Sequence, residues 1–151
     1  MAAKMDVGHQ YVWAALKPLL PYGTVLTCVK RDAQHQLAII VRYARREGFE
    51  FATTPTLANR ESWLPALNFL RGRKYKIAEP GRSLHEHGLA YDFSGPDLQR
   101  IYDAIADGAR TGHIRLVRKP RNLILEHVNH CVHAEIESVR VDGDVFDSPL
   151  V

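Results

Sequence analysis

The chain has 151 residues, of which 46% are hydrophobic and 25% are charged, a composition typical of a soluble globular protein. No apolar run approaches ~20 residues, so the sequence holds no candidate membrane span, and its N-terminus lacks the apolar core of a signal peptide. We therefore expect synthesis in the cytoplasm. The formal net charge of +3 favours anionic partners without choosing among them.

Apolar residues at helical spacing predict helices in the first half of the chain over 9–20, 32–47 and 59–70. Asp32 and Asn59 are the expected N-caps of the last two. β-branched and aromatic residues predict strands over 24–29 and 49–54 and an extended segment over 74–78.

The second half is predicted to be richer in strands. A strand over 89–93 precedes a helix that we expect to open at 94–96, with Pro96 in its first turn, and to end at 108–112. Further strands are expected over 113–117, 122–128 and 131–141, with turns at 119–120 and 142–143. The pattern indicates one α+β domain, residues 1–151, in which helices cover one face of a mainly antiparallel sheet.

A histidine and an aspartate seven residues apart, His85 and Asp92, are the first candidate metal ligands. Gly88 lies between them and permits the tight turn that would bring both side chains to one ion. Zinc in proteins takes histidine nitrogen and carboxylate oxygen at about 2.0–2.2 Å. A third ligand has to come from elsewhere, and histidines are densest over 127–133.

The segment around these residues resembles a known signature. Ser83, His85, Gly88, Ala90 and Asp92 fill every fixed position of S-x-H-x-x-G-x-A-x-D, the pattern of the zinc D-alanyl-D-alanine peptidases. These enzymes cleave peptidoglycan and share their fold with the Hedgehog signalling domain. Two further segments are similar to motifs of that family. Residues 27–36 resemble T-S-G-Y-R-S-x-x-x-Q, although positions 28–30 depart from it. Residues 132–136 resemble the strand that carries the last zinc ligand.

The resemblance implies that Zn²⁺ is the cofactor. Its ligands would be His85, Asp92 and His133, and the fourth coordination position would be left for water, as in catalytic zinc sites. Glu135 would follow His133 on the same face of the strand.

A general base is also implied, and here the chain departs from the family. The family places an acidic residue three positions before the last histidine, where this chain has His130. A histidine can act as a base, but a straight strand would send His130 to the face opposite His133, so the role needs a turn or bulge near 129–130. Glu126 and His127 are the reserve bases.

The resemblance assigns substrate contacts as well. Arg31 would hydrogen-bond the substrate carbonyl and stabilise the oxyanion of the transition state. Gln36 and Ser83 would be supporting substrate-binding residues. Arg60 and Arg82 are the alternatives for the anion-binding arginine.

The predicted function is hydrolysis of an amide bond in peptidoglycan stem peptides by a monomeric zinc peptidase that acts at the bacterial cell wall. Small size and the missing signal peptide favour a phage lysis enzyme. Two alternatives remain open: a non-catalytic zinc domain of the same fold, and a basic nucleic-acid-binding module. Nucleic acid is the weaker partner, because the one basic run that contains an aromatic residue, 71–76, is typical of a solvated loop. Cys28 and Cys131 lie in β-like runs and are expected to stay thiols.

Overall fold

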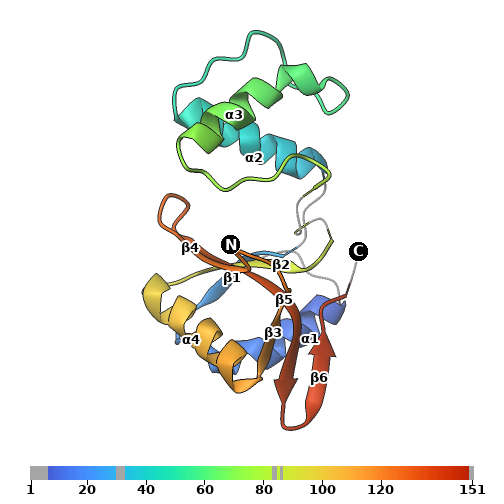
Figure 1. The fold of residues 1–151 in the computed structure, drawn as a ribbon, viewed down its shortest axis with the longest axis vertical. Helices are drawn as coiled ribbons and strands as arrows, with labels where there is room; N and C mark the ends of the chain where they lie inside the picture. The colour runs from blue at the N-terminus through green and yellow to red at the C-terminus, as the bar shows by residue number, and fades with distance from the viewer. Residues whose placement is uncertain (1–6, 30–32, 83–84, 86, 150–151) are drawn as a thin grey trace. The chain divides into compact units, whose positions relative to one another are not determined.

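The structure is a computed structural model that describes residues 7–29, 33–82, 85 and 87–149. The fold is α+β, as predicted: the described residues form four α-helices and a six-stranded, mainly antiparallel sheet with helices packed against it (Figure 1). The chain divides into two compact units, residues 1–30 with 87–151 and residues 31–86. The prediction of one peptidase domain over 1–151 stays a prediction. No helix in the described ranges is long and apolar enough to cross a membrane.

The first unit contains the sheet and the helices α1 (Val7–Leu16) and α4 (Leu98–Thr111), with a short 3-10 helix, η1 (Lys17–Leu19), directly after α1. Its strands are β1 (Val25–Cys28), β2 (Ala90–Ser94), β3 (Ile114–Leu116), β4 (Leu123–Glu126), β5 (Cys131–Val141) and β6 (Asp144–Asp147). The long strand β5 is central, because it pairs with β2, β3, β4 and β6, while β1 pairs with the far edge of β2.

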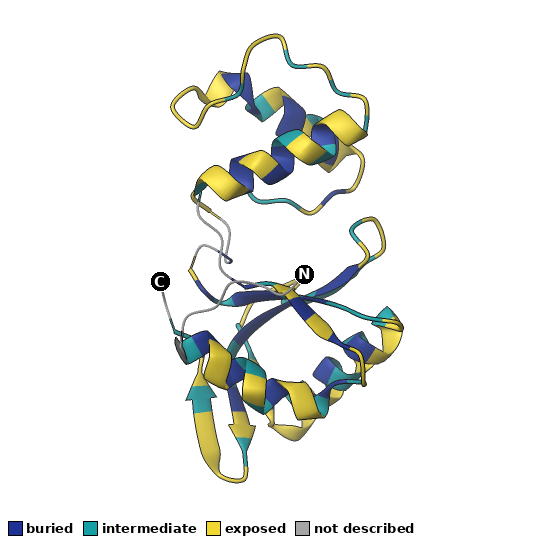
Figure 2. Cartoon of the chain, turned by 180° about the vertical axis from the view of Figure 1, so that it is seen from behind, coloured by how far each residue is buried: buried dark blue, intermediate teal, exposed yellow. Residues whose placement is uncertain are grey.

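One face of this sheet is apolar and forms the core with α1 and α4. Successive side chains of a strand point to opposite faces, so alternate residues of β2 and β5 share the core face. The core side chains from these four elements are Val12, Leu16, Tyr91, Phe93, Ile101, Ile105, Val132, Ala134, Ile136 and Val139. Figure 2 shows the buried and exposed positions that divide each helix into an inner and an outer side. The residues between the core positions, including Asp92 and His133, belong to the other face.

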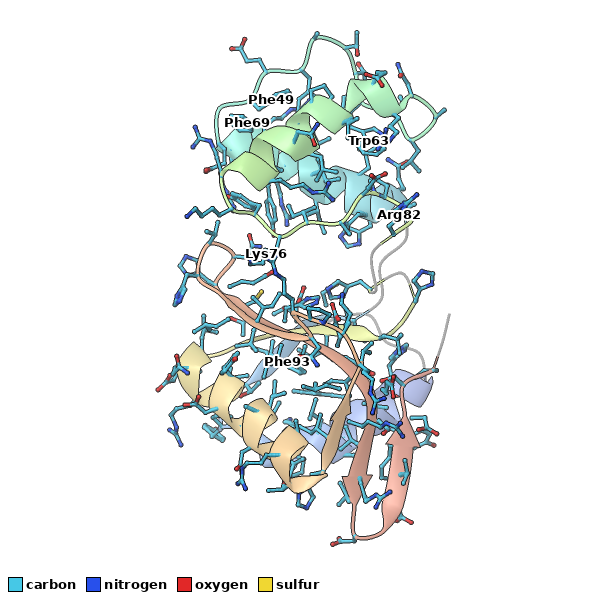
Figure 3. All side chains as sticks on the ribbon, viewed as in Figure 1. Phe49, Trp63, Phe69, Lys76, Arg82 and Phe93 are labelled. Carbon is cyan, nitrogen blue, oxygen red and sulfur yellow. The ribbon has the colours of Figure 1, made fainter. Side chains whose placement is uncertain are left out.

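The second unit is helical and consists of α2 (Ala33–Arg46), η2 (Arg60–Ser62) and α3 (Leu64–Gly72). Its core joins apolar side chains of α2 and α3 with Trp63 and Tyr75. Phe49, in the loop after α2, lies against Phe51 and Phe69 with ring centroids 5.1 and 5.2 Å apart (Figure 3).

Several predicted elements need correction. No strand forms over 49–54, because Phe49 and Phe51 belong to a loop whose aromatic side chains pack against this core. Apolar residues at every second position of this loop give the same sequence pattern as a strand. The extended segment predicted over 74–78 starts one residue later, because Lys74 lies in a turn with a φ of 70°, and residues 75–78 form no strand. Asn59 begins η2 without a side-chain cap, and α3 starts only at Leu64.

The helix start at 94–96 is also shifted. Asp97 is the N-cap of α4 and accepts a hydrogen bond from the Arg100 backbone N–H, so Pro96 precedes the helix instead of occupying its first turn. β6 was not predicted, although the expected turn at 142–143 leads into it. The expected cap Asp32 lies outside the described residues.

Candidate metal centre

The register of three neighbouring strands brings polar residues together on the face opposite the core. Asp92 of β2 pairs with His133 of β5 and, on its other side, with Cys28 of β1. Residues directly opposite each other in an antiparallel pair share a face, with Cβ atoms about 4.5–5.5 Å apart. The three side chains therefore form a row across the sheet.

A β-bulge places Cys28 in this row. Leu26 pairs with Phe93, but the next pair is Cys28 with Asp92, so Thr27 is the extra residue of β1. Leu26 and Val29 both belong to the core although they are three residues apart, which a regular strand of period two does not allow. Without the bulge, Cys28 would point to the core.

The backbone conformation and close neighbours of Gly88 explain why this position of the His-x-x-Gly segment is a glycine. Gly88 has a φ of 78°, in the left-handed region, and a Cβ there would collide with the carbonyl oxygen of Pro149 and lie 2.9 Å from Nε2 of His9. The ring of His9, fully buried in α1, lies with Nε2 2.9 Å from the carbonyl oxygen of Gly88 and packs edge-on against Tyr91 at 6.0 Å. His9 and Pro149 thus hold the backbone between the two candidate ligands.

Three donor atoms come close enough to share one metal ion. Cys28, His85 and Asp92 each offer one ligand atom, and these atoms all lie within 4.8 Å of one another. His85 is buried, while Cys28 and Asp92 are partly buried. A thiolate, an imidazole and a carboxylate are the ligand types of zinc. The donor set therefore fits the predicted cofactor, although other transition metals accept the same ligands.

His133, the predicted third ligand, lies next to this group and is held by two carboxylates. Its Nδ1 is 2.9 Å from Oδ1 of Asp92, and its Nε2 is 3.1 Å from Oε1 of Glu135. Because an ionised carboxylate only accepts hydrogen bonds, both ring nitrogens donate and the ring is an imidazolium. Lys119 completes the row, since its Nζ lies 3.1 Å from both carboxylate oxygens of Glu135.

The pKa values follow from these contacts. Burial alone would lower the pKa of His133, but hydrogen bonds to Asp92 and Glu135 and the negative charges of Asp92 and Glu126 raise it to about 10. Burial would raise the pKa of Glu135, but hydrogen bonds from His133 and Lys119 keep it below its usual value. In the described structure His133 therefore bears a proton on each nitrogen, and its role as a zinc ligand stays a prediction.

The three candidate bases lie at the β4–β5 hairpin. Residues 127–130 form the turn that the His130 interpretation requires, and His130 has a φ of 51°. His127 and His130 are both exposed. Glu126 is half-buried, and its Oε2 accepts hydrogen bonds from the Cys131 thiol at 3.1 Å and the Asn129 amide at 3.3 Å. Of the three, Glu126 is the residue whose charge helps to raise the pKa of His133.

The predicted substrate contacts are only partly described. Arg31 and Ser83 lie outside the described residues. Gln36 is buried and donates a hydrogen bond of 2.7 Å from Nε2 to the carbonyl oxygen of Ala78, a contact that ties α2 to the loop after α3. Arg60 pairs with Glu79 at 3.1 Å.

Sequence reasoning missed the parts played by Cys28, His9 and Lys119. The spacing of Leu26 and Val29 could have indicated the bulge, but only once both were known to be core residues. His9 and Lys119 lie far from the motifs in the sequence, so no local pattern connects them to the site. No disulfide joins Cys28 and Cys131, both of which are described, in agreement with the expected thiols.

Comparisons of the chain with protein-family models, curated proteins and solved structures find no match. The likeness to zinc D-alanyl-D-alanine peptidases therefore rests on the sequence motifs. The structure adds an α+β fold with an antiparallel sheet and a Cys/His/Asp group that can hold a metal ion.

Proposed function

We propose that the chain is a zinc-dependent peptidase that hydrolyses an amide bond in the stem peptides of peptidoglycan, acting as a monomer at the bacterial cell wall. The bond would be of the D-Ala-D-Ala or L-Ala-D-Glu type. The observation that carries the proposal is the convergence of Cys28, His85 and Asp92 within 4.8 Å, because two of these residues are the ligands of the motif.

The chain's own residues support this chemistry in distinct ways. A zinc ion bound here would act as a Lewis acid on the scissile carbonyl. The imidazolium of His133 fixes the Asp92 carboxylate through the 2.9 Å hydrogen bond. For His133 to become a ligand itself, one ring nitrogen has to lose its proton and its carboxylate partner, so zinc binding would release a proton.

A proton acceptor is the second requirement of the proposal. His130 remains the proposed base, with Glu126 and His127 as reserves. Glu126 is the stronger reserve, because it is partly buried and its charge acts on His133, whereas His127 is exposed. Arg31 remains the proposed residue for the substrate carbonyl.

Zinc content and hydrolysis, measured on the same preparations, test the proposal. Wild-type protein should contain about one zinc per chain and release soluble peptides from purified peptidoglycan, and a chelator should abolish the release. Asp92→Ala should lose both properties, whereas Asp103→Ala, an exposed aspartate of α4, should keep both. Mass spectrometry of the digest would identify the bond. Metal-free wild-type protein that hydrolyses peptidoglycan at the full rate would refute the proposal.

A non-catalytic zinc domain is the second candidate. The exposure of His127 and His130 and the lack of an acidic residue at position 130 favour it. The distinguishing result would be stoichiometric zinc in a protein that cleaves none of the stem-peptide bonds.

A further inference from the structure

The positive charge of the chain is concentrated in its helical unit. Residues 31–86 contain ten Lys and Arg residues but six Asp and Glu residues, a net charge of +4. The other unit contains ten basic and eleven acidic residues, a net charge of −1. The anionic partners favoured by the overall charge should therefore bind the helical unit.

Side-chain contacts within this unit bring several of its basic residues together. The Arg46 guanidinium donates a hydrogen bond of 2.7 Å to the Tyr75 hydroxyl, and Arg73 pairs with Glu47 at 3.3 Å. These contacts join the end of α2 to the segment that follows α3. We call the resulting exposed set the basic patch: Arg42, Arg45, Arg46, Arg71, Arg73, Lys74 and Lys76.

Aromatic rings of the core hold several of these guanidinium groups in place. Arg46 lies 4.6 Å above the Tyr43 ring, and Arg73 lies 4.8 Å above the Phe69 ring. Arg42 and Arg45 make similar contacts at 5.3 and 5.5 Å. A guanidinium stacked on a ring keeps its N–H edges available, and its restricted motion reduces the entropy lost when it binds a phosphate.

Stabilisation of the helices explains only part of the patch. Cations in the last turn of a helix interact favourably with its dipole, which accounts for Arg45, Arg46 and Arg71. The other four members lie outside those turns. The acidic residues nearby, Glu47, Glu50 and Glu79, are fewer than the seven basic residues, so the area keeps an excess of positive charge.

The side-chain chemistry favours a phosphate-bearing polymer over a base-reading partner. Proteins that bind single-stranded nucleic acid stack bases on exposed aromatic rings. The exposed large hydrophobic residues within the described part of this unit, 33–82, include Leu57 but no aromatic residue. The exposed guanidinium groups of the patch can each donate two parallel hydrogen bonds to the oxygens of a phosphate group.

We propose that the basic patch binds the phosphodiester polymer of the bacterial cell wall and so retains the protein on the wall. The wall as the location rests on the proposed function, but the binding itself requires no zinc and no hydrolysis. Retention would raise the local concentration of the protein at its substrate.

The test measures binding to walls with and without that polymer. The test protein carries Asp92→Ala, so that walls are not digested, and is sedimented with purified walls before and after chemical removal of teichoic acid. A triple variant, Arg42→Gln with Lys74→Gln and Lys76→Gln, removes three patch charges. A control triple, Lys17→Gln with Arg100→Gln and Arg140→Gln, removes three exposed charges from the other unit.

The patch triple should bind intact walls about 100-fold more weakly, whereas the control should bind nearly as well as the parent protein. Removal of teichoic acid should weaken the parent to the level of the patch triple, and binding should fall steeply with salt. Equal binding to stripped and intact walls, or equal losses in the two triples, would overturn the proposal. Tighter binding to duplex DNA than to purified poly(glycerol phosphate) would also overturn it, in favour of nucleic acid. Hydrolysis by otherwise wild-type protein is scored separately, so failure of the peptidase proposal would be visible on its own.

Discussion

Replacing Gly88 with alanine tests how strongly the packing of His9 and Pro149 against the motif glycine stabilises the segment between the two candidate ligands. Two costs follow from the structure. A left-handed backbone conformation costs a residue with a Cβ about 1–2 kcal/mol, and Gly88 has a φ of 78°. The new methyl group would also overlap the Pro149 carbonyl oxygen and the His9 ring, and such overpacking costs about 1–3 kcal/mol. The free energy of unfolding should therefore fall by about 2–5 kcal/mol.

Gly112→Ala is the matched control. Gly112 follows α4 in the same left-handed conformation, with a φ of 86°, but no atom beyond its chain neighbours lies within 4 Å of the position that a methyl group would take there. It should lose only the backbone term, about 1–2 kcal/mol. Urea unfolding of both variants, followed by circular dichroism, gives the difference. If Gly88→Ala proves no less stable than Gly112→Ala, the packing of His9 and Pro149 against Gly88 does not constrain this segment.

Three further substitutions address the neighbours of the centre. His9→Ala should lower the free energy of unfolding by about 2–4 kcal/mol, because it leaves a cavity and an unpaired carbonyl, and His9→Gln should restore part of the loss in the same urea assay. Cys28→Ser should weaken zinc affinity by at least about tenfold in a chelator competition, because a hydroxyl is a poorer zinc ligand than a thiolate. Cys131→Ser is the control and should change the affinity little. Equal effects of the two substitutions would show that Cys28 is not a zinc ligand. Lys119→Met should cost about 1–2 kcal/mol by taking one charged partner from the buried Glu135 carboxylate, and a variant as stable as wild type would show that His133 alone suffices.

The sequence was sufficient for the fold class and for most strands. The residue bounds of β5 agree with the predicted strand over 131–141, where core and polar residues alternate over 132–137 and β-branched residues continue to Val141. The strand predicted over 49–54 was wrong, because the aromatic residues there lie in a loop and pack against the core of the helical unit. Spacing alone does not distinguish such anchors from a strand.

The site was harder to predict than the fold. His85 and Asp92 were found because seven residues separate them and the motif is local. Cys28 lies opposite Asp92 because of the bulge in β1, and the Asp92 carboxylate reaches His133 through the pairing of β2 with β5. Such relations are set by the strand register, which short sequence patterns do not specify.

The bulge in β1 has an evolutionary consequence. Thr27 is exposed and supplies the extra residue, so its deletion would leave Cys28 as the direct successor of Leu26. The thiol could still pair opposite Asp92, and Val29, then two residues after Leu26, would keep its place on the core face of a regular strand. Loss of a single codon would thus straighten the strand without exchanging its two faces, and would remove only the hydrogen bond of 3.1 Å from the Thr27 hydroxyl to the Asp92 carbonyl oxygen. A lineage that retains the thiol should therefore tolerate a gap at this position as well as many different residues.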